Sequence, residues 1–281
     1  MDPRLAANRD NWNDRVGIHT KSEFYDVERW LSNSDGPPLR EVAAIGAIEG
    51  KSLVHLQCHF GMDALRWARA GAIVTGVDFS PEAITAATAL AERAGLSDRA
   101  TFVCANVYDA PAALSNERFD VVYVSIGSLC WLPSVDQWGE VVASFLNPGG
   151  KIYLHDVHPN ALSLDDSGER TYYSYFEETS DPLVADEPYT YTDGEGLTAA
   201  RTYEWNHSVG EIVMSLTTHG LELDSLIEHD WTQFRQFPWL VETASGEFVI
   251  PARRPRAPLT FTIVAHARER VDRIEDERTR S

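Results

Sequence analysis

The sequence predicts an α/β protein with a mostly parallel sheet that helices cover on both faces. Over residues 53–156, short apolar runs alternate with segments of helical periodicity, as in parallel sheets with crossover helices. The sequence also marks helix boundaries: Ser80 and Pro81 stand at the start of one amphipathic segment, and Gly95 stands at its end. With 281 residues, 43% of them apolar, the chain can form one large domain or two small ones.

Five strands and three helices are predicted in this part of the chain. The strands are SLVHLQC, AIVTGVDF, ATFVCANV, FDVVYVSI and KIYLHDV, in which β-branched and aromatic residues are frequent. MDALRWARA, SPEAITAATALAERAG and VDQWGEVVASFL have the apolar spacing of amphipathic helices. NPGG, residues 147–150, predicts a turn before the fifth strand.

Residues 159–206 interrupt the alternation. Six of the ten tyrosines lie between Tyr172 and Tyr203. YTYT (189–192) and RTYEW (201–205) alternate like strands on either side of DGEG, which predicts a β-hairpin.

The α/β pattern then resumes toward the C-terminus. Ser208 and Glu211 predict a capping box for the helix SVGEIVMSLTTHG. LELDSLIEHD and PLTFTIVAHA are predicted to be the sixth and seventh strands. The charge-dense segment after them is expected to fray.

Charge and cysteine content argue against several classes of protein. The 24 basic and 43 acidic residues give a net charge of −19, which disfavours nucleic-acid partners and anionic membranes. Three cysteines, Cys58, Cys104 and Cys130, do not make a disulfide framework. The polar N-terminus lacks a signal-peptide core, and no apolar run reaches the roughly 18–20 residues that span a bilayer. We expect a cytoplasmic protein, whose oligomeric state the sequence does not indicate.

Polar side chains at strand ends predict a ligand site. HLQCHFGMD, residues 55–63, joins the first strand to a helix N-terminus, where backbone N–H groups suit a carboxylate or phosphate. Asp78 ends the second strand, where an acid can bond a ribose diol, and Asn106 after the third can bond an adenine. SIGSLCWL (125–132) follows the fourth strand. In a parallel sheet these points share the carboxyl edge, where ligands bind.

Four segments, LVHLQCHFGMDALRWARAGAIVTGVDFSPEAI, CANVYDA, FDVVYVSIGSLCWL and NPGGKIYL, resemble the class I S-adenosylmethionine-dependent methyltransferases, over about residues 10–267. The resemblance implies a Rossmann-like, doubly wound, seven-stranded sheet with an antiparallel last strand. It also implies S-adenosyl-L-methionine as cofactor and S-adenosyl-L-homocysteine as product. GAIVTGVDFSPEAI is typical of bacterial small-molecule methyltransferases, so the implied substrate is a small organic molecule.

The same resemblance implies roles for single residues. Asp78 would bind the ribose, the 57–61 turn the methionine end, and residues 106–107 would flank the adenine. The cofactor-binding residues expected on this basis are Tyr25, Gln57, His59, Gly61, Asp78, Phe79, Asn106, Val107 and Ile126. The expected regions are a helical lid (1–45), a cofactor-binding core (46–158), an inserted substrate cap (159–206), the rest of the core (207–267) and a tail (268–281).

The turn departs from the family's pattern, D-x-G-x-G-x-G. Here His55, Gln57, His59 and Gly61 occupy those positions. One hypothesis is that Gln57 and His59 reach the methionyl carboxylate or a nearby water, and the alternative is that they only fill space. Because positive φ disfavours residues with a Cβ by about 1–2 kcal/mol, we expect negative φ at both.

A metal site is the competing interpretation of this stretch. His55, Cys58 and His59 can all bind zinc, and HDVH (155–158) ends a neighbouring strand. Side chains alternate along a strand, however, so His55 and Cys58 should face opposite ways. We expect no metal, and expect Cys58 to be a small buried apolar residue.

Methyl transfer depends mainly on placement, and a base helps where the acceptor carries a proton. His158, after the fifth strand, is the predicted catalytic base, and His155 and His207 are alternatives. A structural histidine bonded to backbone is the competing interpretation for each.

Aromatic side chains are expected to hold the substrate under the lid and cap, where they can exclude water. The three predicted to contact it are Trp131, Tyr172 and Trp205. Ordinary packing is the alternative for each ring. Three other functions stay open: a protein or RNA methyltransferase, a protein that binds the cofactor without transferring methyl, and a NAD-binding protein. The last is disfavoured because G-x-G-x-x-G is absent.

Overall fold

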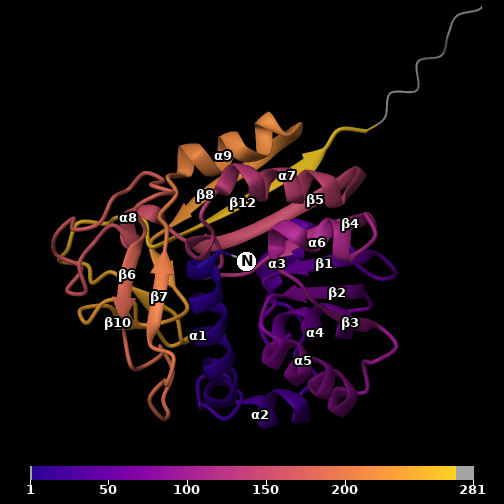
Figure 1. Ribbon diagram of the computed structural model, residues 1–281, viewed down its shortest axis with the longest axis horizontal. Helices are drawn as coiled ribbons and strands as arrows, with labels where there is room; N and C mark the ends of the chain where they lie inside the picture. The colour runs from indigo at the N-terminus through magenta and orange to yellow at the C-terminus, as the bar shows by residue number, and fades with distance from the viewer. Residues whose placement is uncertain (1, 270–281) are drawn as a thin grey trace, which may run out of the picture.

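The computed structural model describes residues 2–269, and its centre is a seven-stranded sheet (Figure 1). The strand order is β3-β2-β1-β4-β5-β12-β8, with β12 antiparallel to both neighbours and parallel pairs among β1 to β5. This confirms the predicted fold class and its antiparallel last strand. The strands are β1 Ser52–Leu56, β2 Ile73–Asp78, β3 Ala100–Cys104, β4 Phe119–Val124, β5 Leu146–Val157, β8 Leu221–His229 and β12 Thr260–Ala267.

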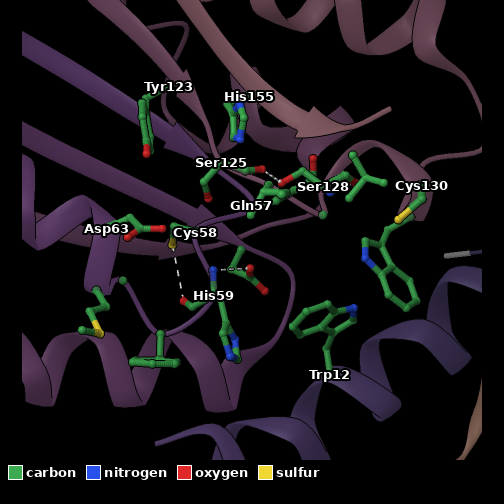
Figure 2. A pocket seen from close by; sticks show the side chains of 18 of the residues that line it. Trp12, Gln57, Cys58, His59, Asp63, Tyr123, Ser125, Ser128, Cys130 and His155 are labelled. Carbon is green, nitrogen blue, oxygen red and sulfur yellow. Dashed lines mark hydrogen bonds between the residues drawn. The ribbon is translucent and has the colours of Figure 1, made fainter. Parts of the chain in front are cut away.

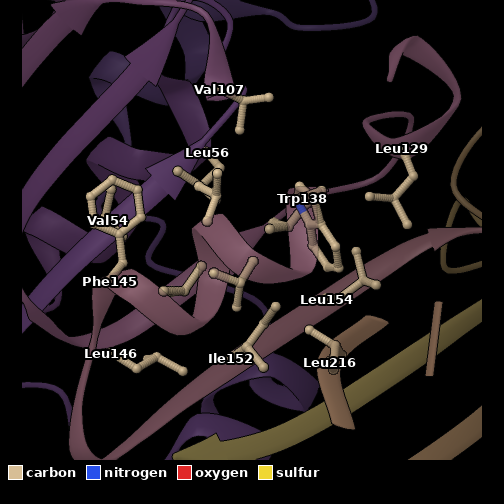
Figure 3. Close-up of a cluster of buried hydrophobic side chains, with 14 of the residues drawn as sticks. Val54, Leu56, Val107, Leu129, Trp138, Phe145, Leu146, Ile152, Leu154 and Leu216 are labelled. Carbon is tan, nitrogen blue, oxygen red and sulfur yellow. The ribbon is translucent and has the colours of Figure 1, made fainter. Parts of the chain in front are cut away.

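Two apolar clusters, one on each face, hold helices to the sheet. Leu53 and Val54 are neighbours in β1 but belong to different clusters, because side chains alternate across a strand. Figure 3 shows one cluster, where Trp138 and Phe145 pack over strand residues such as Ile152. The helices on this face are α6 Ala110–Ala113, α7 Val135–Phe145 and α9 Val209–Thr218, and those on the other are α3 Leu39–Ile45, α4 Met62–Arg69 and α5 Pro81–Ala94.

Helix α1 (Pro3–His19) packs on residues 199–204 of the insertion through buried amides. The side chain of Asn8 donates to Tyr203 O at 2.7 Å and accepts from Tyr203 N at 2.8 Å, so it extends the pairing of strand β7. Asn11 Nδ2 donates to Ala199 O at 2.7 Å. The remaining elements are α2 Val27–Ser32, α8 Pro159–Leu162, β6 Leu183–Asp186, β7 Arg201–Glu204, β9 Trp231–Thr232, β10 Val241–Glu242, β11 Phe248–Val249 and 3-10 turns at Val107–Asp109 and Leu129–Trp131.

The predicted helix caps are confirmed. Ser80 accepts a hydrogen bond from Ala83 N at the start of α5, and Gly95 ends that helix with φ +67°. Ser208 and Glu211 form the capping box of α9.

Two local predictions are wrong. Residues 189–192 form no strand, and β7 pairs instead with β6, residues 183–186, further back along the chain. The predicted turn at 147–150 lies inside β5, where pairing with β4 shifts register after Phe119. The tail, from residue 270 on, lies outside the described residues. None of the helices in residues 2–269 is long and apolar enough to cross a membrane.

The contact between α7 and α9 generates a prediction about stability. A Cβ added at Gly139 of α7 would lie 2.6 Å from Ser215 O of α9, so Gly139→Ala forces the helices apart. We expect a loss of about 1–3 kcal/mol in the free energy of unfolding, measured by urea denaturation. Gly17→Ala is the control, because no atom lies within 4 Å of its added Cβ on helix α1. The control should stabilise the protein by about 0.5–1 kcal/mol. Equal effects of both variants would contradict the close contact.

Candidate functional site

A cavity of about 630 Å³ lies at the carboxyl edge of the parallel strands, beneath α1 (Figure 2). Its wall combines the turn after β1, the ends of β2, β4 and β5, and the lid segment. The structure therefore brings together predicted residues from distant parts of the sequence. Those that line the cavity are Tyr25, Gln57, His59, Gly61, Asp78, Phe79, Asn106, Val107, Ile126 and Trp131.

The turn between β1 and α4 keeps a left-handed backbone at two positions that lack glycine. φ is +56° at Gln57 and +51° at His59, so the expectation of negative φ is wrong. Two hydrogen bonds offset the strain, which is about 1–2 kcal/mol per residue. His59 N donates to Asp78 Oδ2 at 2.8 Å, and Gln57 Nε2 donates to Ser128 O at 2.8 Å. Gln57 and His59 thus adopt the backbone conformation that favours glycine.

Gly61 is the position in this turn where the structure has no room for a side chain. Its φ is +76°, and a Cβ would lie 2.6 Å from the ring of Phe102. The turn therefore needs glycine for space at one position and tolerates other residues at the two before it.

Asp78 ties this turn to the start of α5. Its Oδ1 accepts from Ser80 N at 2.9 Å, while Oδ2 accepts the His59 N–H. Burial raises the pKa of Asp78 to about 6, and the bonds from Ser80, His59 and Phe79 N–H groups lower it in part. Each carboxylate oxygen retains a lone pair for a further donor, such as a ligand hydroxyl.

Two amide side chains at this end of the cavity have polar groups that are free to bond a ligand. Asn106 Oδ1 accepts from Tyr108 N at 3.0 Å, which leaves its NH₂ group to donate to a ligand. Gln57 Oε1 is buried and has no hydrogen-bond partner within residues 2–269. A polar ligand can therefore meet two acceptor groups, the Asp78 carboxylate and Gln57 Oε1, and one donor group, the NH₂ of Asn106.

His59 reaches a different element from Gln57. Its Nε2 lies 2.9 Å from Nδ1 of His19 in α1, and its ring packs edge-on against Trp12 and Phe60. Burial, then the neighbouring His19, lower the pKa of His59 well below its ordinary value. His59 is therefore a neutral contact between the turn and the lid helix.

The structure does not support His158 as the base. His158 is absent from the described wall of the cavity, and both ring nitrogens are engaged. Nε2 lies 2.8 Å from Glu228 Oε1, and Nδ1 accepts from Asn160 N at the start of α8. The side chain caps a helix, which is the structural role that sequence reasoning weighed against catalysis.

The two alternative histidines differ from each other. His207 is bonded to Glu177 through Nδ1 and to backbone carbonyls through Nε2, and it is not among the described lining residues. His155 lines the cavity, with Nδ1 2.9 Å from Thr262 Oγ1 and Nε2 buried without a bonded partner in the described chain. Burial lowers the pKa of His155 to about 3, so it is a weak base at neutral pH.

Only one of the three predicted substrate aromatics lies in the described cavity wall. Trp131 lines it, and its ring meets Trp12 edge-on at 5.3 Å between centroids. Tyr172 is 75% exposed on the surface of the insertion. Trp205 is buried, with its indole N–H donating to Thr179 O. Alternation of aromatics in the insertion therefore does not by itself identify cavity residues, because Tyr191 lines the cavity whereas Tyr172 and Trp205 are absent from its described wall.

Among the polar residues of the wall that sequence reasoning missed are Tyr123, Glu41 and Asp63. Tyr123 OH donates to Glu41 Oε2 at 2.8 Å, and Asp63 lies in the first turn of α4. Burial, then the charge of Asp63, raise the pKa of Glu41 to about 7. Asp63 follows Gly61 by two residues, which was a usable signal, whereas nothing in the sequence brings Glu41 to this edge. Within residues 2–269, no three His, Cys, Asp or Glu side chains gather as a metal site requires.

Comparison with known proteins identifies the central segment. A family model described as a methyltransferase domain matches residues 54–150. A ubiquinone biosynthesis O-methyltransferase of Ralstonia nicotianae is 29% identical over 140 residues, 47% of this chain and 57% of that one. A ribosomal protein L11 methyltransferase of Photobacterium profundum is 30% identical over 186 residues, 66% of this chain and 51% of that one. The chain spans about half the length of these relatives.

Solved structures agree on the fold. A SAM-dependent methyltransferase of Methanosarcina mazei has a TM-score of 0.56 at 22% identity, with 84% of this chain and 100% of that one covered. The complex of DhpI with SAH has a TM-score of 0.55 at 16% identity, with 96% and 100% covered. Residues 54–150 therefore match a methyltransferase-domain family model, and the chain has the Rossmann-like fold of solved S-adenosylmethionine-dependent methyltransferases.

Proposed function

We propose that the protein is a cytoplasmic methyltransferase that transfers the methyl group of S-adenosylmethionine to a small organic molecule. The observation that carries this proposal is one continuous cavity, which runs from Asp78 and Asn106 past the turn to Tyr123 and His155, with Trp12 of α1 in its wall. A roofed space of this kind suits a small acceptor beside the cofactor. The relative named for ubiquinone biosynthesis supports the same class of substrate.

The free groups at the cofactor end fit S-adenosylmethionine. In this proposal Asp78 accepts from the ribose hydroxyls, the Asn106 NH₂ group donates to the adenine, and Val107 and Phe79 flank the ring. Gln57 Oε1 is an acceptor, so it suits the methionyl ammonium better than the carboxylate expected from the sequence. When bound, the cofactor would supply a methyl group on a sulfonium, and an acceptor atom in line with the S–CH3 bond would take the methyl while the sulfur leaves as S-adenosylhomocysteine. The protein contributes placement and exclusion of water.

The roof over the cavity is held by side chains from the lid and the insertion. His19 Nε2 lies 2.7 Å from Thr190 Oγ1, while its Nδ1 contacts His59. Tyr25 OH and Tyr191 OH are 2.6 Å apart. We propose on this basis that residues 1–45 and 159–206 act together as lid and cap.

The acidic charge and the roof count against a protein or RNA acceptor, although one relative is named for a ribosomal protein. The test incubates purified protein with methyl-labelled S-adenosylmethionine and separate pools of metabolites, protein and RNA. It distinguishes a small-molecule acceptor from a protein or RNA acceptor. We expect label in the small-molecule fraction. Label in protein or RNA would favour the first alternative, and cofactor binding without transfer to any pool would favour an inactive binding protein.

Removal of the Asp78 carboxylate should weaken cofactor binding. We expect Asp78→Ala to lower the affinity for S-adenosylhomocysteine about 10- to 100-fold, the loss of a charge-assisted bond pair. Isothermal titration calorimetry measures this affinity. Asp78→Asn retains one acceptor oxygen, so its affinity for S-adenosylhomocysteine should fall less than that of Asp78→Ala. Circular dichroism checks that both variants fold. Normal binding by folded Asp78→Ala would refute the role.

Buried His19, which is held neutral, should contribute a loss of stability in acid. Burial, then Arg15, lower the pKa of His19 from 6.5 to about 3. At this residue the unfolded state therefore binds more protons below pH 6.5, so the stability present above that pH is lost as pH falls toward 3. The raised pKa values of Asp78 and Glu41 act in the opposite direction, so the prediction concerns the difference between variant and unchanged protein. Between pH 7.5 and pH 5.5, urea denaturation should show a more negative change in the free energy of unfolding for the unchanged protein than for His19→Gln. Burial also lowers the pKa values of His55 and His155, so His19→Gln should keep the part of the pH effect that comes from these two histidines. An unchanged pH dependence in His19→Gln would contradict the prediction.

A further inference from the structure

Beyond the cofactor turn, the cavity widens into a polar space that the cofactor roles above do not use. We call it the carboxylate chamber, and its polar wall is formed by Glu41, Asp63, Tyr123, His155 and Gln233. Figure 2 shows Asp63, Tyr123 and His155 on one side of the turn and Trp12 on the other. The chamber therefore lies on the opposite side of Gln57 and Cys58 from the lid helix.

Two carboxylates line this chamber. Glu41 is 5% exposed and its partner among the described residues is the Tyr123 hydroxyl. Asp63 is bonded to Arg66 at 3.1 Å, but its side chain remains 41% exposed. Because Asp63 lines the cavity, a ligand in the chamber can contact its carboxylate directly. Burial, then the charge of Asp63, raise the pKa of Glu41.

The wall also carries buried polar atoms without partners in the described chain. Two are amide oxygens, which only accept hydrogen bonds, and they belong to Gln233 and Gln236. His155 is 3% exposed, and its Nε2 likewise has no bonded partner, although the Gln233 side chain is close enough to favour protonation of His155. A polar atom left unpaired in a dry site is unfavourable. A ligand that supplies donors would satisfy these acceptors.

Two of the three arginines in the described cavity wall, Arg66 and Arg40, have carboxylate partners. Arg66 bonds Asp63 at 3.1 Å, and Arg40 bonds Glu247 at 2.6 Å and lies over the ring of Trp231. The third, Arg15 of α1, bonds Asn11 and lies over the rings of Trp12 and Trp131. The chamber itself presents two carboxylates and the amide oxygen of Gln233, unpaired within residues 2–269, which favours a neutral or positively charged ligand group over an anion.

We propose that the carboxylate chamber is the acceptor subsite, and that it binds an amino or hydroxyl group of a small molecule through Asp63 and Glu41. This inference rests on the proposed methyltransferase function and specifies its substrate class. The rest of the acceptor would contact the apolar part of the wall, which includes Met62, Val157, Leu162 and Phe234. Carboxylate acceptors are excluded because two acids would face a third.

The test compares three probes that share one ring and differ in the polar group: benzylamine, benzyl alcohol and benzoate. Each is titrated into the full chain saturated with S-adenosylhomocysteine, with calorimetry or ligand-observed NMR as the readout. We expect benzylamine or benzyl alcohol to bind at least tenfold more tightly than benzoate. The stronger of the two identifies the group as amine or hydroxyl.

Two variants locate the binding. Asp63→Asn should weaken the preferred probe at least tenfold, which is about 1.4 kcal/mol. Glu41→Gln keeps the shape of the side chain and an acceptor for the Tyr123 hydroxyl. It should also weaken binding of the preferred probe, and it replaces Asp63→Asn as the test if that variant fails to fold. Asp98→Asn, at an exposed acid outside the described cavity wall, is the charge-matched control and should bind like the unchanged protein.

The inference is overturned if benzoate binds best, if no probe binds, or if folded Asp63→Asn and Glu41→Gln keep the original preference. Failure of the proposed function has a different signature. In that case the unchanged protein would not bind S-adenosylhomocysteine, and calorimetry would show this before any probe is added.

Discussion

The carboxylate of Asp78 is the constraint on which the ligand-binding edge depends. One oxygen holds the N–H of His59 in the turn after β1, and the other holds the N–H of Ser80 before α5. A buried acid that accepts from two backbone N–H groups fixes two loops relative to each other. This allows a turn with side chains at Gln57 and His59 to keep a left-handed path, since the strain is offset by bonds that a free loop would not have. Asp78 therefore shapes the pocket as well as facing it.

The sheet and its carboxyl edge could be predicted from the sequence because both follow from short-range patterns. Apolar runs, caps at Ser80 and Ser208, and a single polar residue at each strand end do not depend on distant contacts. The same logic correctly grouped Asp78, Asn106 and Trp131 in one cavity wall. The backbone at Gln57 was predicted incorrectly because propensity describes an isolated residue, whereas here a hydrogen bond to Ser128 helps to set the conformation.

Other parts of the site depend on tertiary contacts that no local pattern reports. His158 has the sequence position of a cleft residue, but its ring lies against Glu228 and the start of α8. Glu41 comes from the short helix α3, outside the alternating strand–helix pattern, and bonds the Tyr123 hydroxyl in the cavity wall. The insertion pairs β6 with β7 because residues 190–191 are instead bonded to His19 and Tyr25. Strand-like alternation could not reveal that competition.

The buried amides of Asn8 and Asn11 have a consequence for how ligands enter. Both side chains are fully buried, and they join α1 to the backbone of residues 199–203 as a strand would. Helix α1 and this part of the insertion should therefore move together as one rigid unit, which we call the flap, and not separate from each other. Admission of a molecule then requires the bond of His19 to His59 of the cofactor turn to break, whereas the contacts of His19 with Thr190 and of Tyr25 with Tyr191 can be kept.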